Sequence, residues 1–137
     1  MIDVNIYCKR LRRGDDLRGG IEAYARRCGI NAAALCACAG CVSAWRVRAA
    51  GGKTILQGGE HCEIVSLTGT VSRNGCHLHI ALAREDLSVF GGHLTEGCIV
   101  DTTAEIVLEE IDGVVFRRQF DAETGYNELV VLPAGQQ

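Results

Sequence analysis

Three histidines near the middle of the chain have the residue type and the spacing of a metal site. His77 and His79 are two residues apart, and His93 follows a double glycine. Apolar residues surround the pair and a turn signal at Asn74-Gly75 precedes it, which predicts a strand. Residues two apart on a strand point to the same face, so the two imidazoles are expected to converge. A zinc-like ion needs such convergence, because a histidine nitrogen binds it at about 2.0–2.1 Å.

The number of histidines bears on what a metal would do. Structural zinc sites are usually closed by four protein ligands, whereas catalytic sites have three and keep one position for water or substrate. His93, from a neighbouring strand, would be the third ligand. An HxH pair also occurs by chance, and a single histidine on a strand is more often an ordinary core or surface residue. The residues alone therefore leave metal binding and ordinary packing both open.

The segments around the histidines predict the elements that hold them. Asn74-Gly75 is the strongest short hairpin signal, so a strand over residues 62–71 is expected to turn there into a strand over 76–84. The double glycine before His93 allows another chain or a ligand to come close.

The start of the chain predicts a strand and then a helix. Residues 2–8 alternate between apolar and polar types, which is typical of a half-buried strand with its even-numbered residues inward. Asp15 or Asp16 can cap the helix that follows, because a carboxylate accepts hydrogen bonds from free N–H groups and suits that end of the dipole. The helix is expected to end at Gly29.

The rest of the chain predicts strands. Residues 30–42 are small and apolar and indicate a buried strand, and residues 43–50 indicate a separate one. Residues 98–110 are rich in β-branched types and indicate a long strand. Asp112-Gly113 turns the chain, and residues 114–120 are expected to pair back.

These elements predict an α+β fold with a mostly antiparallel sheet and one main helix. The 137 residues suffice for one domain with a substantial core and are too few for two. We therefore expect one domain over residues 1–137, with its core at about 3–132 and a frayed end at 133–137. No apolar run approaches a membrane span, and the first residues do not read as a signal peptide. A cytoplasmic protein without membrane contact is expected.

Eight cysteines are a high number for this length. Without a secretory signal they are expected to be reduced thiols and not a disulfide framework. Cys38 and Cys41 form a CxxC within the small apolar run, where free cysteine behaves as a small hydrophobe. Core packing is favoured there over redox chemistry, and zinc binding by Cys36, Cys38 and Cys41 is the third alternative.

The charge of the chain bears on nucleic-acid binding. The formal net charge is −3, and the arginine and lysine clusters are offset by acidic neighbours. A protein that grips phosphates usually has a clustered basic excess. The Arg-Gly-Arg-Pro core of an AT-hook does not occur in the sequence. Tight DNA binding is therefore not expected.

Four runs together resemble the PPC domain, the plant and prokaryote conserved domain that occurs with AT-hooks in plants and often alone in prokaryotes. The matching runs are Glu63-Ile64-Val65-Ser66-Leu67-Thr68-Gly69-Thr70, Gly75-x-His77-Leu78-His79, Gly91-Gly92-His93-Leu94-x-x-Gly97 and Ala104-Glu105-Ile106. The resemblance implies a mixed α/β fold that assembles as a homotrimer, with His77, His79 and His93 as a metal unit. The fold is also distantly similar to acetolactate decarboxylase, a zinc enzyme with a three-histidine site. The fourth histidine, His61, falls outside this triad and is interpreted as a loop residue.

These observations and the resemblance predict a trimer that binds zinc or another divalent metal through His77, His79 and His93 and acts on a small molecule. Glu105 is the candidate general acid/base or hydrogen-bond partner of a ligand histidine, with a surface carboxylate as the alternative. Arg46 is the candidate group for holding a small anionic ligand. Two other functions stay open, which are a DNA-associated role by family analogy and a non-catalytic trimeric scaffold.

Overall fold

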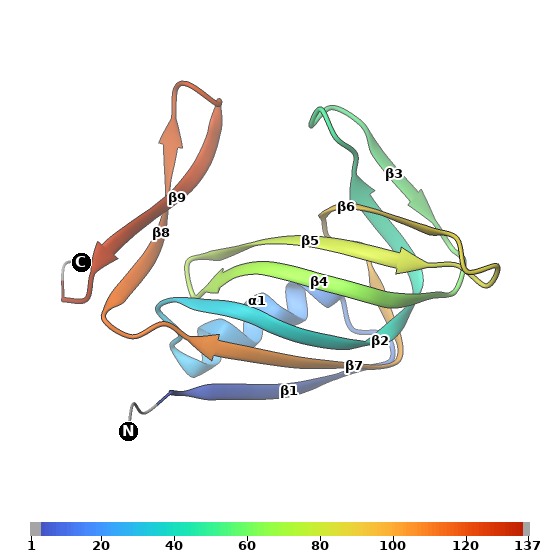
Figure 1. Cartoon of the computed structure of the whole chain (residues 1–137), viewed down its shortest axis with the longest axis horizontal. Helices are drawn as coiled ribbons and strands as arrows, with labels where there is room; N and C mark the ends of the chain where they lie inside the picture. Colours follow the sequence, from blue (N-terminus) through green and yellow to red (C-terminus); the bar gives the residue numbers. More distant parts are fainter. Residues whose placement is uncertain (1–3, 136–137) are drawn as a thin grey trace.

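The computed structural model describes residues 4–135 and contains, within them, one helix and nine strands (Figure 1). In chain order the elements are β1 (Ile6–Arg12), α1 (Leu17–Cys28), β2 (Ala33–Arg48), β3 (Ile55–Gly58), β4 (Cys62–Ser72), β5 (Gly75–Ala83), β6 (Val89–Leu94), β7 (Ile99–Glu110), β8 (Val114–Asp121) and β9 (Tyr126–Pro133). The mostly antiparallel sheet with one helix agrees with the predicted α+β fold. In the part of the chain that is described, no helix has the length and apolar character needed to cross a membrane.

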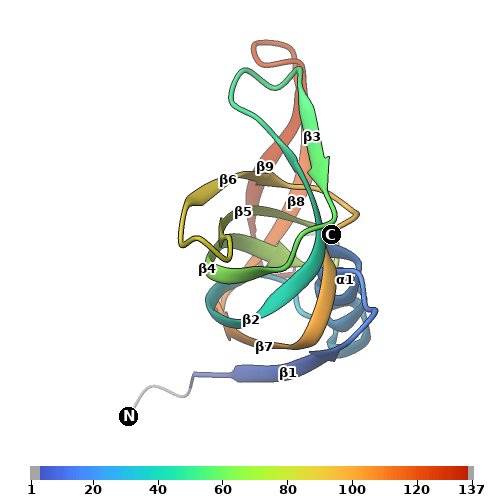
Figure 2. The same cartoon turned by 90° about the vertical axis from the view of Figure 1, so that its right-hand side faces the viewer.

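Seven strands form one sheet that curls on itself. The order is β1-β7-β2-β4-β5-β6, and β3 pairs with the far end of β2. The same end of β2 also pairs with β6, so β2, β4, β5 and β6 close into a ring of strands (Figure 2). This closure brings β6, which carries His93, against a strand more than forty positions earlier in the chain.

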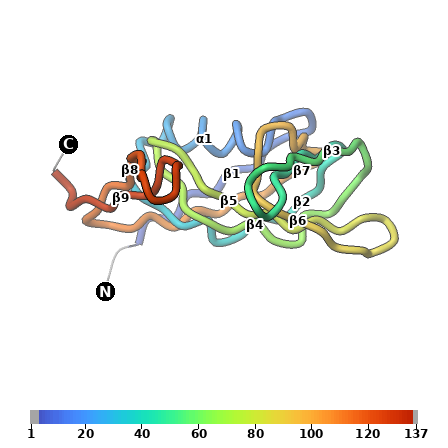
Figure 3. The backbone as a smooth tube through the Cα atoms, turned by 90° about the horizontal axis from the view of Figure 1, so that it is seen from above, coloured from blue at the N-terminus to red at the C-terminus, as the bar shows by residue number. Residues whose placement is uncertain are grey.

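The helix covers one face of this sheet and supplies part of the core (Figure 3). Asp16 caps it, as predicted, by accepting a 2.7 Å hydrogen bond from the Gly19 N–H. The helix ends before Gly29, whose left-handed conformation closes the last turn. Leu17, Ile21 and Ala25 point inward and are buried against the sheet.

The chain forms one long strand where two were predicted. Residues 30–42 and 43–50 were expected to be separate, but β2 runs without interruption through sixteen residues. Its first part pairs with β4 and β7, and its last part pairs with β3 and β6. Register shifts along the β7 ladder let the strand bend between these partners without ending.

The C-terminal pairing also differs from the prediction. Residues 114–120 were expected to pair back onto the long strand, but β8 pairs with β9 in a separate two-stranded sheet. Both edges of β7 are already occupied, by β1 and by β2, so no edge is left for β8. The β8–β9 hairpin therefore stands at one end of the molecule (Figure 1). The Phe116 N–H fixes its base by donating to the Asn31 carbonyl at 2.9 Å.

The first strand buries the opposite face from the one that was predicted. Ile6 is 51% exposed, whereas Leu11 is only 3% exposed. Tyr7 packs edge-on against Tyr24 of α1, so the odd-numbered residues face the helix. The alternation in the sequence identifies a strand but does not say which face a helix will cover; Ile2 lies outside the described residues.

A strip of small and apolar residues crosses the sheet face away from α1, beside charged residues such as the exposed Glu105. Cys8, Val107 and Ala37 lie opposite one another on three neighbouring strands and form a strip across that face. Val65 of β4 is 55% exposed. No helix or strand among residues 4–135 covers this strip.

Candidate metal centre

The three histidines converge on one point. His77 and His79 lie on β5, and His93 lies on β6 directly opposite His79 in the strand register. One nitrogen from each ring can be chosen so that all three lie within 4.8 Å of one another. The Nε2 atoms of His77 and His79 are 3.2 Å apart.

One of these separations already matches what a small divalent ion requires. For nitrogens at about 2.0–2.1 Å from a tetrahedral ion, the nitrogen–nitrogen distance is about 3.4 Å. The His77–His79 separation of 3.2 Å is already close to that value. The third nitrogen lies within 4.8 Å of the other two, and the ring centroids are 5.0–5.8 Å apart, so a side-chain rotation would suffice to complete the site.

Local sequence explains why the histidines share a face. The hairpin at Asn74-Gly75 sets the register of β4 and β5. Within β5, Leu78 and Ile80 turn inward and are buried, so His77 and His79 turn outward. The predicted hairpin is therefore confirmed, with strands at Cys62–Ser72 and Gly75–Ala83.

The double glycine lets β6 fit between two strands. A Cβ atom on Gly91 would lie 2.1 Å from the Ile80 carbonyl oxygen, and one on Gly92 would lie 2.5 Å from the Arg48 carbonyl oxygen. Any larger residue would push β6 away from β5 or β2. The expected close approach at this glycine pair is what holds His93 beside His79.

The surroundings keep two of the histidines neutral. Burial lowers the pKa of His93 to about 4, and the positive charge of Arg48 contributes to the shift. Burial, then the charges of His79 and Arg118, lower the pKa of His77. Metals bind the neutral imidazole, so a lowered pKa keeps these rings ready to bind at neutral pH.

One ring nitrogen of the three histidines is buried without a partner. The Nδ1 atom of His93 is buried and has no hydrogen-bond partner within residues 4–135. A buried polar atom normally has a partner, and each exception requires an explanation. Together with the convergent geometry, this atom indicates that the cluster fits a bound cation.

A pocket of about 390 Å³ opens beside the histidines. It lies beside the first residues of β5, which precede the part of this strand that pairs with β6. The β8–β9 hairpin and the end of β2 lie on either side of it. Its lining residues are Arg18, Arg48, Asn74, Gly75, Cys76, His77, His93, Arg118, Tyr126, Asn127 and Glu128. The pocket therefore joins two of the three histidines to three arginines.

Sequence reasoning missed these three arginines. Arg48 lies directly opposite His93 in the β2–β6 register, a pairing between distant strands that no local pattern signals. Arg18 comes from the first turn of α1, and Arg118 comes from the β8–β9 hairpin. The one usable signal was that Arg46 and Arg48 are two residues apart on a predicted strand and so share a face, and it did not indicate which of the two lies at the site.

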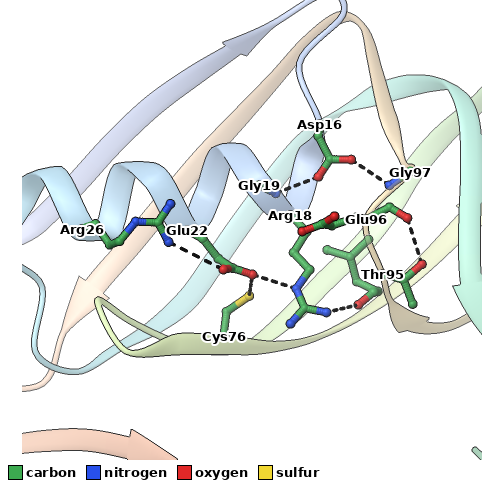
Figure 4. A network of polar contacts seen from close by, with 10 residues as sticks. Asp16, Arg18, Gly19, Glu22, Arg26, Cys76, Thr95, Glu96 and Gly97 are labelled. Atoms are coloured by element: carbon green, nitrogen blue, oxygen red, sulfur yellow. Dashed lines mark hydrogen bonds and ion pairs between the residues drawn. The ribbon is translucent and has the colours of Figure 1, made fainter.

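Arg18 is held by a network on α1 (Figure 4). Its Nε donates to a Glu22 carboxylate oxygen at 2.8 Å, and its Nη1 donates to the Leu94 carbonyl at 3.3 Å. Glu22 also pairs with Arg26 and accepts a contact from the Cys76 thiol at 3.5 Å. The guanidinium of Arg18 is thereby fixed at the β5 side of the helix.

The two other sequence candidates lie outside this pocket. Arg46 reaches toward Thr95 and the Glu96 carbonyl, at 3.5 and 3.4 Å, and does not line the pocket. Glu105 is exposed on β7, where it faces Arg10 and Ala39. Two strands, β2 and β4, separate it from β5, so it does not meet the histidines of its own chain.

The remaining histidine and the cysteines play other parts. The Nδ1 atom of His61 lies 3.0 Å from an Asp101 carboxylate oxygen, in a hydrogen-bonding contact on the surface. All eight cysteines are free thiols, as predicted. Burial raises the pKa of Cys38 to about 12, which suits packing and not redox chemistry. Within the described residues, the histidine triad is the one cluster of three or more metal-binding side chains, so the cysteine alternative finds no support.

The family of the chain follows from comparison with known proteins. Residues 3–112 match the model of the Plants and Prokaryotes Conserved (PCC) domain. The chain belongs to this family. A protein from Salmonella enterica of unassigned function superposes on the chain with a TM-score of 0.91 and 31% identity, over 96% of both chains.

Other similar proteins include one that contains a metal, one with a provisional DNA-binding role and a much longer bifunctional protein. The metal-containing protein AF0104 from Archaeoglobus fulgidus has a TM-score of 0.75 and 29% identity, over 95% of this chain and 96% of its own. A protein from Bacteroides thetaiotaomicron, provisionally described as DNA-binding, has a TM-score of 0.82 over 92% and 91% of the two chains, but its 24% identity shows the fold alone. The bifunctional protein GlmU of Synechococcus sp. strain JA-3-3Ab is 37% identical over 92% of this chain. The chain spans only 20% of that protein's length.

Proposed function

We propose that the chain binds a divalent metal ion, zinc or a similar one, through His77, His79 and His93. The observation that carries this proposal is the convergence of three ring nitrogens within 4.8 Å, two of them 3.2 Å apart. The metal-containing relative from Archaeoglobus fulgidus supports it. Three neutral protein ligands leave one position of a tetrahedral ion open.

An open position favours a metalloenzyme that acts on a small molecule over a purely structural site. A bound metal would supply Lewis acidity and would lower the pKa of coordinated water. The chain supplies the pocket beside the histidines, three arginines, and Glu128, whose charge opposes the lowering of the His77 pKa. Glu128 is therefore a better-placed proton acceptor than Glu105. Glu105 does not reach the histidines of its own chain and could act only on those of a neighbouring protomer.

The metal proposal is tested by metal analysis of purified protein. The expected result is about one zinc per chain in wild type, and its loss in His77→Ala and in His93→Ala, because two histidines seldom retain a structural or catalytic ion. His61→Ala is the matched control, since this histidine pairs with Asp101 and lies outside the cluster. Equal metal in all four proteins, or none in wild type, would contradict the proposal.

We also propose that the chain assembles as a homotrimer. The strip of small and apolar residues across the open sheet face supports this, because an exposed apolar patch usually marks an interface. Light scattering is expected to give three times the chain mass of 14.7 kDa. Val107→Lys is expected to dissociate the assembly, and a stable wild-type monomer or dimer would refute it.

DNA binding is the second candidate, and it rests on family analogy. The net charge of −3 disfavours it, since phosphate contacts need a basic surface. Weak binding that disappears as salt rises is expected in a fluorescence-anisotropy titration. Tight, sequence-selective binding at physiological salt would overturn this expectation and would favour the DNA-associated role.

A further inference from the structure

We propose that Arg18, Arg48 and Arg118 form an anion site beside the metal, which selects a small molecule that carries a carboxylate or a phosphate group. The inference rests on the proposed metal function and names the class of ligand for its open position. It differs from the sequence prediction in the residues that do the binding, because Arg46 lies further along β2 and outside the pocket.

The charges of the pocket call for an anion. The histidines beside it are neutral ligands, so they do nothing to offset the charge of a divalent ion. Three guanidinium groups line the same pocket, and Glu128 is its one acidic residue among those described. Glu22, the nearest partner of Arg18, is shared with Arg26. An excess of positive charge that is partly shielded from water is costly unless it is paired, so an anionic ligand would stabilise the site.

Two of the arginines lack an acidic partner. Across residues 4–135, neither Arg48 nor Arg118 forms an ion pair with a carboxylate. They come from different elements, β2 and the β8–β9 hairpin, and yet line one pocket. Surface arginines are common, but two unpaired ones that meet beside a metal-binding cluster indicate a binding site.

The arginines are held in position by neutral contacts. The guanidinium of Arg48 lies over the Tyr126 ring, 5.5 Å from its centroid. The Nη2 of Arg118 donates to the Thr70 hydroxyl at 3.2 Å. A guanidinium that is already held loses less freedom when it binds, and its planar fork matches a carboxylate or phosphate.

The size of the pocket limits the ligand. A volume of about 390 Å³ is at the lower end of the range for small-molecule sites. Asn74 and Asn127 add amide groups that can bind hydroxyl or carbonyl oxygens. The geometry therefore suits a short hydroxy acid, oxo acid or phosphate whose second oxygen faces the histidine cluster.

Calorimetric titration of zinc-loaded protein tests the inference. The probes are lactate, inorganic phosphate and the uncharged amide lactamide. Lactate or phosphate is expected to bind about tenfold or more tightly than lactamide, because charge-assisted hydrogen bonds are lost with the charge. Whichever of the two anions binds more tightly shows whether the site prefers a carboxylate or a phosphate.

Matched arginine variants show which side chains carry the binding. Arg48→Gln and Arg118→Gln are each expected to weaken the anion by about tenfold or more, while their zinc content stays that of wild type. Arg46→Gln is the control, since this arginine neighbours Arg48 in sequence but lies outside the pocket, and it should change affinity by about twofold at most. Unchanged affinity in both pocket variants, or equal binding of lactate and lactamide, overturns the inference.

Zinc content separates this inference from the metal proposal. Wild-type protein that holds zinc but binds neither anion leaves the metal site standing and removes the arginine site. Wild type without zinc refutes the metal proposal, and titration of that protein with phosphate then tests the arginines alone. Phosphate binding that Arg48→Gln weakens would support the anion site, and absence of binding would overturn it as well.

Discussion

Replacing Gly92 by alanine should both destabilise the fold and weaken metal binding. The new Cβ atom would lie 2.5 Å from the Arg48 carbonyl oxygen. This distance is half an ångström shorter than 3.0 Å, the limit below which Cβ contacts are essentially never found. The neighbour is backbone, so it cannot rotate away, and β6 must move from β2. Overpacking of this kind typically costs about 1–3 kcal/mol.

The same shift would displace His93 from the other two histidines. A ligand group must be held within about 0.5 Å of its working position, so a displacement of that size should lower zinc affinity. Urea denaturation measures the loss of stability, and titration against a chromogenic chelator measures zinc affinity.

Gly59→Ala is the control for this prediction. Gly59 lies in a loop, and a Cβ atom there would meet nothing within 4 Å. Its stability and zinc affinity should equal those of wild type. If Gly92→Ala behaved like Gly59→Ala in both assays, the close approach of β6 to β2 would not be what positions His93.

Three further predictions concern the histidine, the thiols and the helix cap. In metal-free protein the His93 pKa of about 4 lies below its ordinary 6.5, so the unfolded chain binds a proton at this histidine before the folded protein does. The free energy of unfolding should therefore fall as pH drops from about 6.5 to about 4. Urea denaturation should show a smaller fall with pH for His93→Gln, and an equal fall would refute the shift. Exposed Cys8 should react with a maleimide at pH 8 well before Cys38, whose pKa of about 12 keeps it protonated, as peptide mass spectrometry would detect. Asp16→Ala should lower the free energy of unfolding by about 0.5–2 kcal/mol, because Asp16 accepts two backbone N–H groups at 2.7 Å; an unchanged urea midpoint would contradict this role.

Local sequence patterns determined the parts of this protein that depend on neighbouring residues. The cap at Asp16 and the stop at Gly29 follow from the hydrogen-bonding needs of helix ends. The hairpin at Asn74-Gly75 follows from turn chemistry. The convergence of His77 and His79 follows from the two-residue period of a strand, which needs no knowledge of the rest of the fold.

Identifying the third histidine as a ligand, and identifying the family, required a different kind of information. A double glycine signalled that a backbone would come close to His93, but only the joined motifs of the PCC family linked that residue to the other two. The register of β5 with β6 brings His79 and His93 opposite each other. Spacing alone could not predict that register, since thirteen residues and a turn lie between the two.

Only the tertiary structure decided which charged residues face the site. The ring formed by β2 and β6 brings Arg48 beside His93, whereas Arg46, two residues away on the same face, lies beside Thr95 and Glu96. The occupation of both edges of β7 sends the C-terminal strands into their own hairpin, which carries Arg118 to the pocket. Each outcome depends on which strand edge remains for pairing once the sheet has formed, and that is a property of the whole sheet and not of any local stretch of sequence.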